Sequence, residues 1–411
     1  MKPRNILILI ITAAVLAAAA VFTRKDESKQ KTSAQLGDDL FPSLDVNAVR
    51  KIEMTAPDST VTVARVDGAW VVTEKFGYPA SFGRVKEFLL GLTELKQGME
   101  VPANDDDRAS LQLLDPSLAS AIDKGSAATR LTLYNESGSA LTSILVGKQP
   151  EAKAPQGPGP MGFGGYASGR YIDLAGTVYL LSENLSDVGQ TTDRWLEKQL
   201  LNIPRSEIVE VTRSGPDVDA ITISRAGVDD SFSLADLATN EVTVSYKMDN
   251  LTGALSFLNF SDIASPSLSV EETGLAAPVL FTARTAIGKI ITVMIGGKVD
   301  DGETRYASIW AIYEAPPLPA ATSPLDAEAE AARLEQQAKA QQEVSDLNAG
   351  VANWVYILES YISDRFLIKR VDLLEPPPEP EEEDQPDADA DGADADAPAQ
   401  SEVPESDEDD S

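Results

Sequence analysis

The chain has 411 residues, 43% of them apolar, which is enough for two or three domains with real cores. Its formal net charge is −32, so binding to nucleic-acid phosphates is not expected. It contains no His and no Cys, which excludes Ser-His-Asp and Cys-His catalysis, disulfides and zinc sites built on those ligands. Any enzymatic chemistry would therefore depend on Asp, Glu, Lys, Tyr or Ser.

An uncharged, largely apolar run at 6–22 follows a short basic leader at 1–5. As a helix it would span roughly 25 Å, just short of a ~30 Å hydrocarbon core. It fits either a cleaved signal with an A-x-A site at 18–20 or a retained anchor, and because the apolar character continues through Phe22 we expect the anchor. The leader favours a body outside the cytoplasm, although the basic residues after the run argue for the opposite orientation.

A polar linker at 23–39 precedes the first patterned region. Alternating apolar and polar residues predict several strands, and apolar residues spaced from Val85 to Leu95 at helical intervals predict a helix between them. The predicted strands of this region are VRKIEM (49–54), STVTVARV (59–66), AWVVTEKF (69–76), TRLTLYN (129–135), TSILVGK (142–148) and TVYLLSE (177–183).

The second half of the chain repeats these landmarks in the same order. The corresponding segments are EIVEVTR (207–213), AITISRA (220–226), a helical face at Leu251, Ala254, Leu255 and Leu258, PVLFTAR (278–284), IITVMIGGK (290–298) and VYILES (355–360). Arg305-Tyr306 likewise matches Arg170-Tyr171. We interpret the chain as two tandem homologous α+β modules, at 40–204 and 205–374, with mainly antiparallel sheets and short helices.

Each predicted module ends on Asp-Arg-aromatic-Leu-x-Lys, at 193–198 and at 364–369. Neighbouring residues of a helix do not face each other, so Asp and Arg are not expected to form a pair along one face. We expect Asp to cap a helix, Arg and Lys to be solvated, and Trp195 and Phe366 to be packing anchors, rather than a duplicated catalytic centre. The other tryptophans, at 70, 310 and 354, are also expected to pack in the core or between modules.

The second module carries an insertion at 315–350, Pro-rich and then helical. Ser323 and Pro324 suit the start of a helix that runs through about Leu347. Its apolar stripe, at Leu334, Ala338, Val344 and Leu347, is narrow, so the helix either contacts a partner or lies solvated on its own module. The acidic tail at 375–411, which has 17 Asp and Glu and no Lys or Arg, is expected to be disordered.

Several motif-like patterns lack the context their chemistry needs. Asp387, Asp389 and Asp391 match the start of a calcium loop, but Pro398 stands where a bidentate Glu belongs. The glycines of 157–162 match G-x-G-x-x-G, but no helix is expected after them. The S-x-x-K at 28–31 lies in the linker. We therefore assign no catalytic, cofactor-binding or metal residue and no cofactor, and the binding residues are unknown.

The first module resembles a bacterial family known as domain of unknown function 4340. The residues that carry the resemblance are Leu40-Phe41-Pro42, Val46-Asn47, Ile52, Gly68-Ala69-Trp70-Val71-Val72, Tyr78-Pro79-Ala80 and Val85 to Leu95. The likeness extends more softly over about 40–374. It implies a membrane-anchored envelope protein, often encoded beside ABC-transporter components of the gliding-motility type. No catalytic residue is implied.

These observations predict a non-enzymatic, single-pass, extracytoplasmic accessory or scaffold protein, with the membrane and an ABC-type transport complex as partners. The insertion and the acidic tail are the candidate contact elements. The alternative is a carboxylate-dependent envelope hydrolase or polymer-binding protein, which needs convergent carboxylates and exposed aromatic residues. A cytoplasmic-facing scaffold is a third hypothesis, if the charges after the anchor decide its orientation.

Overall fold

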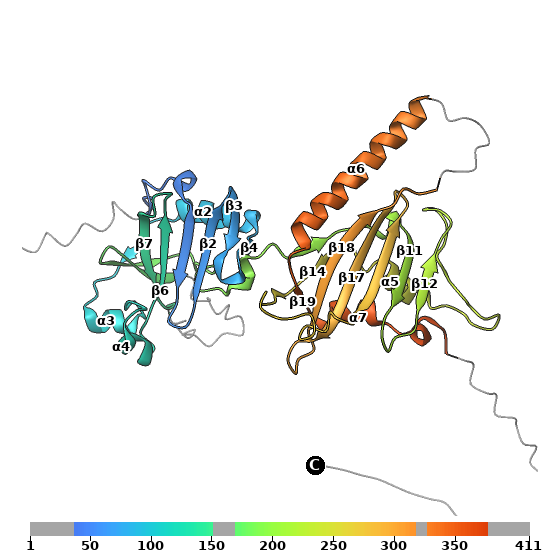
Figure 1. The fold of residues 1–411 in the computed structure, drawn as a ribbon. Coiled ribbons are helices and arrows are strands. Elements are labelled where there is room, and N and C mark those ends of the chain that lie inside the picture. Colours follow the sequence, from blue (N-terminus) through green and yellow to red (C-terminus); the bar gives the residue numbers. More distant parts are fainter. Residues whose placement is uncertain (1–36, 151–168, 318–326, 377–411) are drawn as a thin grey trace, which may run out of the picture.

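The computed structural model describes residues 37–150, 169–317 and 327–376, which form two β-sheets with helices packed on them (Figure 1). The first sheet with its helices is called the first module, and the second sheet with its helices the second module. Neighbouring strands pair antiparallel throughout these described sheets, which confirms the mixed, mainly antiparallel α+β architecture. The predicted leader, anchor and most of the linker and acidic tail lie outside the described residues. No helix within these three ranges is long and apolar enough to cross a membrane.

The first sheet has nine strands. They are β1 (Lys51–Thr55), β2 (Thr60–Val66), β3 (Ala69–Val72), β4 (Tyr78–Pro79), β5 (Met99–Glu100), β6 (Thr129–Tyr134), β7 (Ala140–Val146), β8 (Arg170–Leu174) and β9 (Thr177–Leu181). Their order in the sheet is β4-β3-β2-β1-β6-β7-β8-β9-β5. Successive side chains of a strand face opposite sides, so in β1 the apolar Ile52 and Met54 are buried while their neighbours are half-exposed.

The second sheet has eight strands. They are β11 (Ile208–Ser214), β12 (Ile221–Ser224), β13 (Ser233–Leu234), β15 (Asp262–Ile263), β16 (Val279–Thr285), β17 (Lys289–Lys298), β18 (Arg305–Tyr313) and β19 (Tyr356–Leu358). Their order is β13-β12-β11-β16-β17-β18-β19-β15. This order equals that of the first sheet, strand for strand, once β4 is set aside. Between the modules, β10 (Gln199–Leu201) pairs with β14 (Leu258–Asn259).

One helix in each module covers the core face beside the first three strands. In the first module α2 (Phe82–Glu94) buries Val85, Phe88, Leu89 and Leu92, as the spacing predicts. In the second module α5 (Ser245–Thr252) is shorter than expected. It ends before Gly253, so the predicted residues Ala254, Leu255 and Leu258 are buried but lie in the following turn and in β14. The other described helices are α3 (Asp105–Ser110), α4 (Ala119–Asp123), α6 (Ala327–Val351) and α7 (Ser360–Leu367), with short 3-10 turns at Val46–Ala48 (η2), Thr73–Lys75 (η3), Thr192–Trp195 (η4), Arg205–Glu207 (η5) and Arg370–Leu373 (η6).

The two Asp-Arg-aromatic phrases provide packing, as expected. Trp195 in η4 is fully buried and meets Phe88 edge to face, with ring centroids 5.2 Å apart. Phe366 in α7 is also fully buried and meets Phe281 at 4.9 Å. The expected capping role of Asp is wrong at both phrases, because Asp364 lies inside α7, whose N-cap is Glu359, and Asp193 lies inside the 3-10 turn η4. There its carboxylate accepts hydrogen bonds from Lys198 and Thr191, which lower its pKa although partial burial opposes them.

The repeated Arg-Tyr landmark also has a structural explanation. Arg170 donates to the carbonyl of Gly147, at 2.7 Å, and Arg305 donates to the carbonyl of Gly296, at 3.2 Å. Both glycines lie against backbone. A Cβ at Gly147 would be 2.3 Å from the carbonyl oxygen of Leu111, and a Cβ at Gly296 would be 2.3 Å from that of Thr273. The two modules therefore share this local arrangement as well as the strand order.

The long helix α6 lies partly on its own module and partly projects from it. Its carboxyl-terminal half packs on the second module, where Ala340, Val344 and Val351 are buried. There Asn348 hydrogen-bonds to the edge of β18 beyond the short strand β19. Its side chain accepts from the amide of Ala311 and donates to the carbonyl of the same residue, both at 2.8 Å. The amino-terminal half extends away from the sheet (Figure 1), and Leu334 is 52% exposed.

The modules join through aromatic side chains. Tyr78 of the first module meets Phe260, Trp354 and Tyr356 of the second, with ring centroids 5.2, 5.0 and 6.2 Å away. Lys75 forms an ion pair with Asp262 across the same interface, at 2.6 Å. The expected inter-module role of Trp354 is thus confirmed.

The prediction for Trp310 is wrong. Trp310 is 40% exposed on the outer face of β18, because it alternates with the core residues Ile309 and Ala311. Its register partner on β17 is Thr292. Trp70 is half-buried and borders an open pocket rather than lying in the core.

Candidate functional site

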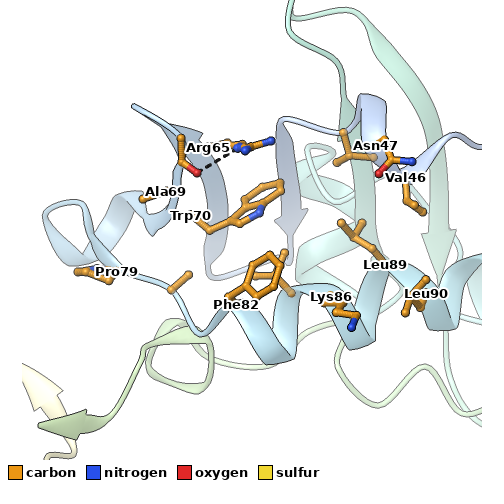
Figure 2. Close-up of a pocket in the computed structure, with 14 residues that line it drawn as sticks. Val46, Asn47, Arg65, Ala69, Trp70, Pro79, Phe82, Lys86, Leu89 and Leu90 are labelled. Carbon is orange, nitrogen blue, oxygen red and sulfur yellow. Dashed lines mark hydrogen bonds between the residues drawn. The ribbon is translucent and has the colours of Figure 1, made fainter.

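The first module contains an open pocket of about 590 Å³ between the β2–β3 hairpin and α2 (Figure 2). This volume lies in the range of small-molecule sites, roughly 300–1,000 Å³. The sheet contributes Trp70 from one side, α2 contributes Phe82, Leu89 and Leu90 from the other, and the turn at η2 closes the end with Val46. The pocket is an extension of the core that side chains of the described residues do not fill.

The walls of the pocket are apolar and partly exposed. Val85 and Leu89 form a buried floor, because they belong to the inward face of α2. Phe82 and Leu90 lie at the mouth, where they are 65% and 43% exposed. Exposed apolar residues gathered around a concave site mark a place where another molecule binds, more than single scattered ones do.

The charged groups of the pocket are both cations. Arg65 donates through Nε to the carbonyl of Gly68, at 3.1 Å, which fixes its guanidinium above the hairpin turn. Lys86 extends from α2 at the mouth. Neither residue forms an ion pair with any carboxylate in the described parts of the chain. Although the chain has a net charge of −32, the two charged side chains that line the pocket are both positive.

The second module fills the corresponding place with its own side chains. The register of β1 with β2 and of β11 with β12 makes Arg225 the counterpart of Arg65. The hairpin partner of Arg225 is Phe232 and that of Arg65 is Trp70, so both partners are aromatic. Arg225 lies over the ring of Phe232 with its guanidinium carbon 4.5 Å from the centroid. A second guanidinium, from Arg205, lies 5.0 Å from the same centroid. Phe232 is therefore covered by two cations.

Arg205 is held in this position by α5. Its Nε donates to the hydroxyl of Thr252, at 2.8 Å, and its Nη2 lies 2.5 Å from the carboxylate of Asp249. The paired strands and the buried helix faces align the two modules residue by residue. In this alignment Val46 corresponds to Arg205, and Lys86 corresponds to Asp249. The first module lacks both the plugging guanidinium and the carboxylate that holds it.

This arrangement offers contacts suited to recognition. Among the described residues that line the pocket, none is Asp, Glu, Ser, Thr or Tyr, so it offers no carboxylate acid or base and no hydroxyl nucleophile. It offers a tryptophan face, aliphatic walls and two cationic donors. It can therefore bind an apolar group that also carries negative charge.

A second cleft, of about 540 Å³, lies between the modules and is more polar. Its carboxylates are Glu197 and Glu359, beside the exposed Tyr361. The same cleft contains Arg84, Arg194 and Lys198. This is the place in the described structure where the carboxylate-dependent alternative can be tested.

The motif-like patterns found in the sequence do not contribute to either site. The aspartates of 387–391, the glycines of 157–162 and the S-x-x-K at 28–31 all lie outside the described residues. Within the described ranges, no group of three or more Asp or Glu is placed to hold a metal ion. Sequence reasoning named Trp70, Val46 and Asn47, but only as packing or family residues. Aligning the two modules would have exposed the contrast of Val46 with Arg205.

The fold and the site thus define an antiparallel α+β protein with an open, largely apolar pocket in its first module. The resemblance noted from the sequence is confirmed, since the family model described as Domain of unknown function (DUF4340) matches residues 70–156. This range contains Trp70, α2 and Lys86, but not η2 or the second module. No curated protein and no solved structure matches the chain.

Proposed function

We propose that this protein is a non-enzymatic accessory or scaffold protein of the bacterial envelope, with the first-module pocket as its recognition site and the mouth of that pocket facing its partner. The carrying observation is the lining of that pocket, which combines Trp70 and aliphatic walls with two unpaired cations and no acid–base or nucleophilic carboxylate or hydroxyl. Such a site supports binding of an apolar group that carries negative charge, because its apolar walls and its two cations complement those features.

The likeness of the two modules supports a recognition role for the first module and a structural role for the second. The two sheets have the same strand order, and the Arg170–Gly147 and Arg305–Gly296 contacts repeat. In this proposal two homologous modules, at 40–204 and 205–374, descend from one unit. The second filled its pocket with Arg205 and became a structural support, and the first kept an open site.

The membrane placement rests on sequence and family resemblance. The apolar run at 6–22 would anchor the chain once, with the body facing the periplasm, and the family resemblance suggests an ABC-type transport complex as the partner. The amino-terminal half of α6, with exposed Leu334, is the second contact element, together with the acidic tail.

The sidedness is tested by fusing alkaline phosphatase at residue 40 of the anchored chain. Activity in intact cells is expected, because the enzyme needs an oxidising compartment to form its disulfides. An inactive fusion would indicate a cytoplasmic-facing scaffold and contradict the placement.

The partner interaction is tested by co-purification from membranes of the full-length chain. Charge reversal at the pocket, Lys86→Glu, is expected to lower recovery of the partner, whereas Lys298→Glu, the same change on the surface of the second module, should not. For α6 the variant is Leu334→Glu, because deleting 316–350 would also remove the buried Ala340 and Val344 and the edge contact of Asn348. Unchanged recovery in both Lys86→Glu and Leu334→Glu would reject these contact surfaces.

The alternative is a carboxylate-dependent envelope hydrolase or polymer-binding protein that uses the cleft between the modules. Glu197, Glu359 and the exposed Tyr361 are the observation that favours it. A Glu197→Gln/Glu359→Gln variant that still reaches the membrane but no longer maintains a normal cell wall would support this alternative. An unaltered phenotype would count against it.

A further inference from the structure

The hydrogen-bonding groups of the first-module pocket restrict the chemistry of its ligand. Lys86, Arg65 and the Trp70 indole supply donors, whereas Asn47 is the only side chain with an acceptor oxygen among the described residues that line the pocket. A bound group must therefore be rich in acceptors and poor in donors, because a buried donor without a partner is costly. An anionic head such as a carboxylate or phosphate meets this requirement.

The backbone beside the pocket is already paired, which disfavours a peptide that adds as a strand. Ala80 donates to the carbonyl of Trp70, at 2.8 Å, and Ser81 donates to the carbonyl of Trp195, at 2.8 Å. The carbonyl of Pro79 accepts from Glu197, at 3.0 Å. A peptide has one donor for each acceptor along its backbone, and it would find no free edge here.

The filled copy in the second module shows what the geometry accepts. There the occupant is the Arg205 side chain, an apolar stem that ends in a charged group, stacked on Phe232 and paired with Asp249. The first module has Trp70 in place of Phe232 and the cation Lys86 in place of the anion Asp249. An occupant that reproduces the same contacts with opposite charge is an apolar chain that ends in an anion.

We infer that the first-module pocket binds an anionic amphiphile, with its acyl chain between Trp70 and α2 and its carboxylate or phosphate head at Lys86 and Arg65. The inference rests on the proposed function only in treating this pocket as a recognition site. It names an anionic amphiphile as the ligand class. The two sources of such a ligand are a free fatty acid and an anionic membrane lipid.

The test is photochemical cross-linking in the full-length chain reconstituted in vesicles. A benzophenone amino acid replaces Leu90 at the mouth of the pocket, and the vesicles contain phosphatidylcholine alone, with added oleate, or with added phosphatidylglycerol. The mass of the adduct identifies the occupant. We expect an oleate or phosphatidylglycerol adduct, and which of the two forms identifies the source. The same amino acid at the exposed Tyr246 of α5 is the control position and should give neither.

A self-plugging variant provides the specificity control. Val46→Arg/Lys86→Asp copies the Arg205–Asp249 pair into the first module, so it should fill the pocket without opening a cavity. The anionic adduct should then fall at least about tenfold, as expected from the loss of a charge-assisted contact and of the apolar site. Unaltered thermal unfolding of this variant verifies that the module is folded. Adducts of equal yield in the variant, adducts with phosphatidylcholine alone, or cross-links to a protein segment would overturn the inference.

These results are separable from those on the proposed function. Co-purification that depends on Lys86, without an anionic adduct, would leave the accessory role standing and remove the amphiphile. An anionic adduct together with an inactive alkaline phosphatase fusion would support the amphiphile and contradict the proposed placement in the envelope.

Discussion

The guanidinium carbon of Arg205 lies 5.0 Å from the ring centroid of Phe232, in the second-module position that corresponds to the open pocket of the first. The stack is fastened to α5 through Asp249 and Thr252. The same fold therefore contains a closed and an open version of one site, and the difference follows from a few side chains rather than from the backbone.

Arg205→Val, which copies the first-module residue, should destabilise the second module by about 1–2 kcal/mol. The loss combines a cation–π contact and the hydrogen bond to Thr252, whereas the exposed ion pair with Asp249 adds little. Urea unfolding of the full-length chain measures the change. Arg194→Val, at an exposed arginine of the first module, is the matched control and should stay within about 0.5 kcal/mol of wild type. Equal stability of both variants would show that Arg205 is not a plug.

Gly147→Ala and Gly296→Ala should each destabilise their own module, by at least about 2 kcal/mol. The added methyl would lie 2.3 Å from a carbonyl oxygen in both cases, and that oxygen belongs to backbone that cannot move freely. Gly91→Ala in α2 is the control. Its Cβ meets no atom within 4 Å, so higher helix propensity should stabilise it by about 1 kcal/mol. A neutral effect at either Gly147 or Gly296 would refute the shared close approach.

Asn348→Ala should release the carboxyl-terminal half of α6 from the edge of β18. Both backbone groups of Ala311 lose their partner, which costs about 1–3 kcal/mol if they stay buried. Hydrogen exchange of α6 should become faster, and we expect no change in Gln341→Ala, an exposed neighbour on the same helix. Slow exchange retained in Asn348→Ala would mean that apolar packing at Val344 and Val351 alone holds the helix.

Stability should fall at alkaline pH because of the interface tyrosines. Burial raises the pKa of Tyr78 from 10.0 to about 12, and burial together with the neighbouring Tyr78 raises that of Tyr356. A raised pKa in the folded state means that the stabilisation is fully present below pH 10 and is lost as the pH rises through about 12. Tyr78→Phe removes one of these ionisations, so its unfolding free energy should decline less over this window than that of wild type or of Tyr246→Phe, an exposed tyrosine. Parallel declines in all three would contradict the assignment.

Much of the fold follows from local patterns in the sequence. Alternating residues such as Ile52 and Met54 predict strands because one face of an antiparallel sheet is buried, and the spacing of Val85, Phe88 and Leu92 predicts α2. The repeated Trp195 and Phe366 could be identified as anchors, since large aromatic residues in a recurring phrase are usually packed. The length of α5 was overestimated, because helical spacing continues past Gly253 although the helix does not.

What the sequence could not reveal depends on contacts between distant elements. The exposure of Trp310 follows from which face of β18 meets the core, and the role of Asn348 follows from a free strand edge. The pocket is a cavity between distant elements, and the importance of Val46 and Lys86 depends on the pairing of their counterparts Arg205 and Asp249, which the structure shows.

The central claim is that the first module keeps open, for a ligand, the place that the second module fills. The most direct measurement is the binding isotherm of dodecanoate to the full-length chain in phosphatidylcholine nanodiscs, with empty nanodiscs subtracted, for wild type and for Val46→Arg/Lys86→Asp. The account predicts one saturable site in wild type and at least about tenfold weaker binding in the double variant. Equal affinity in the two proteins, or no saturable site in wild type, would contradict it.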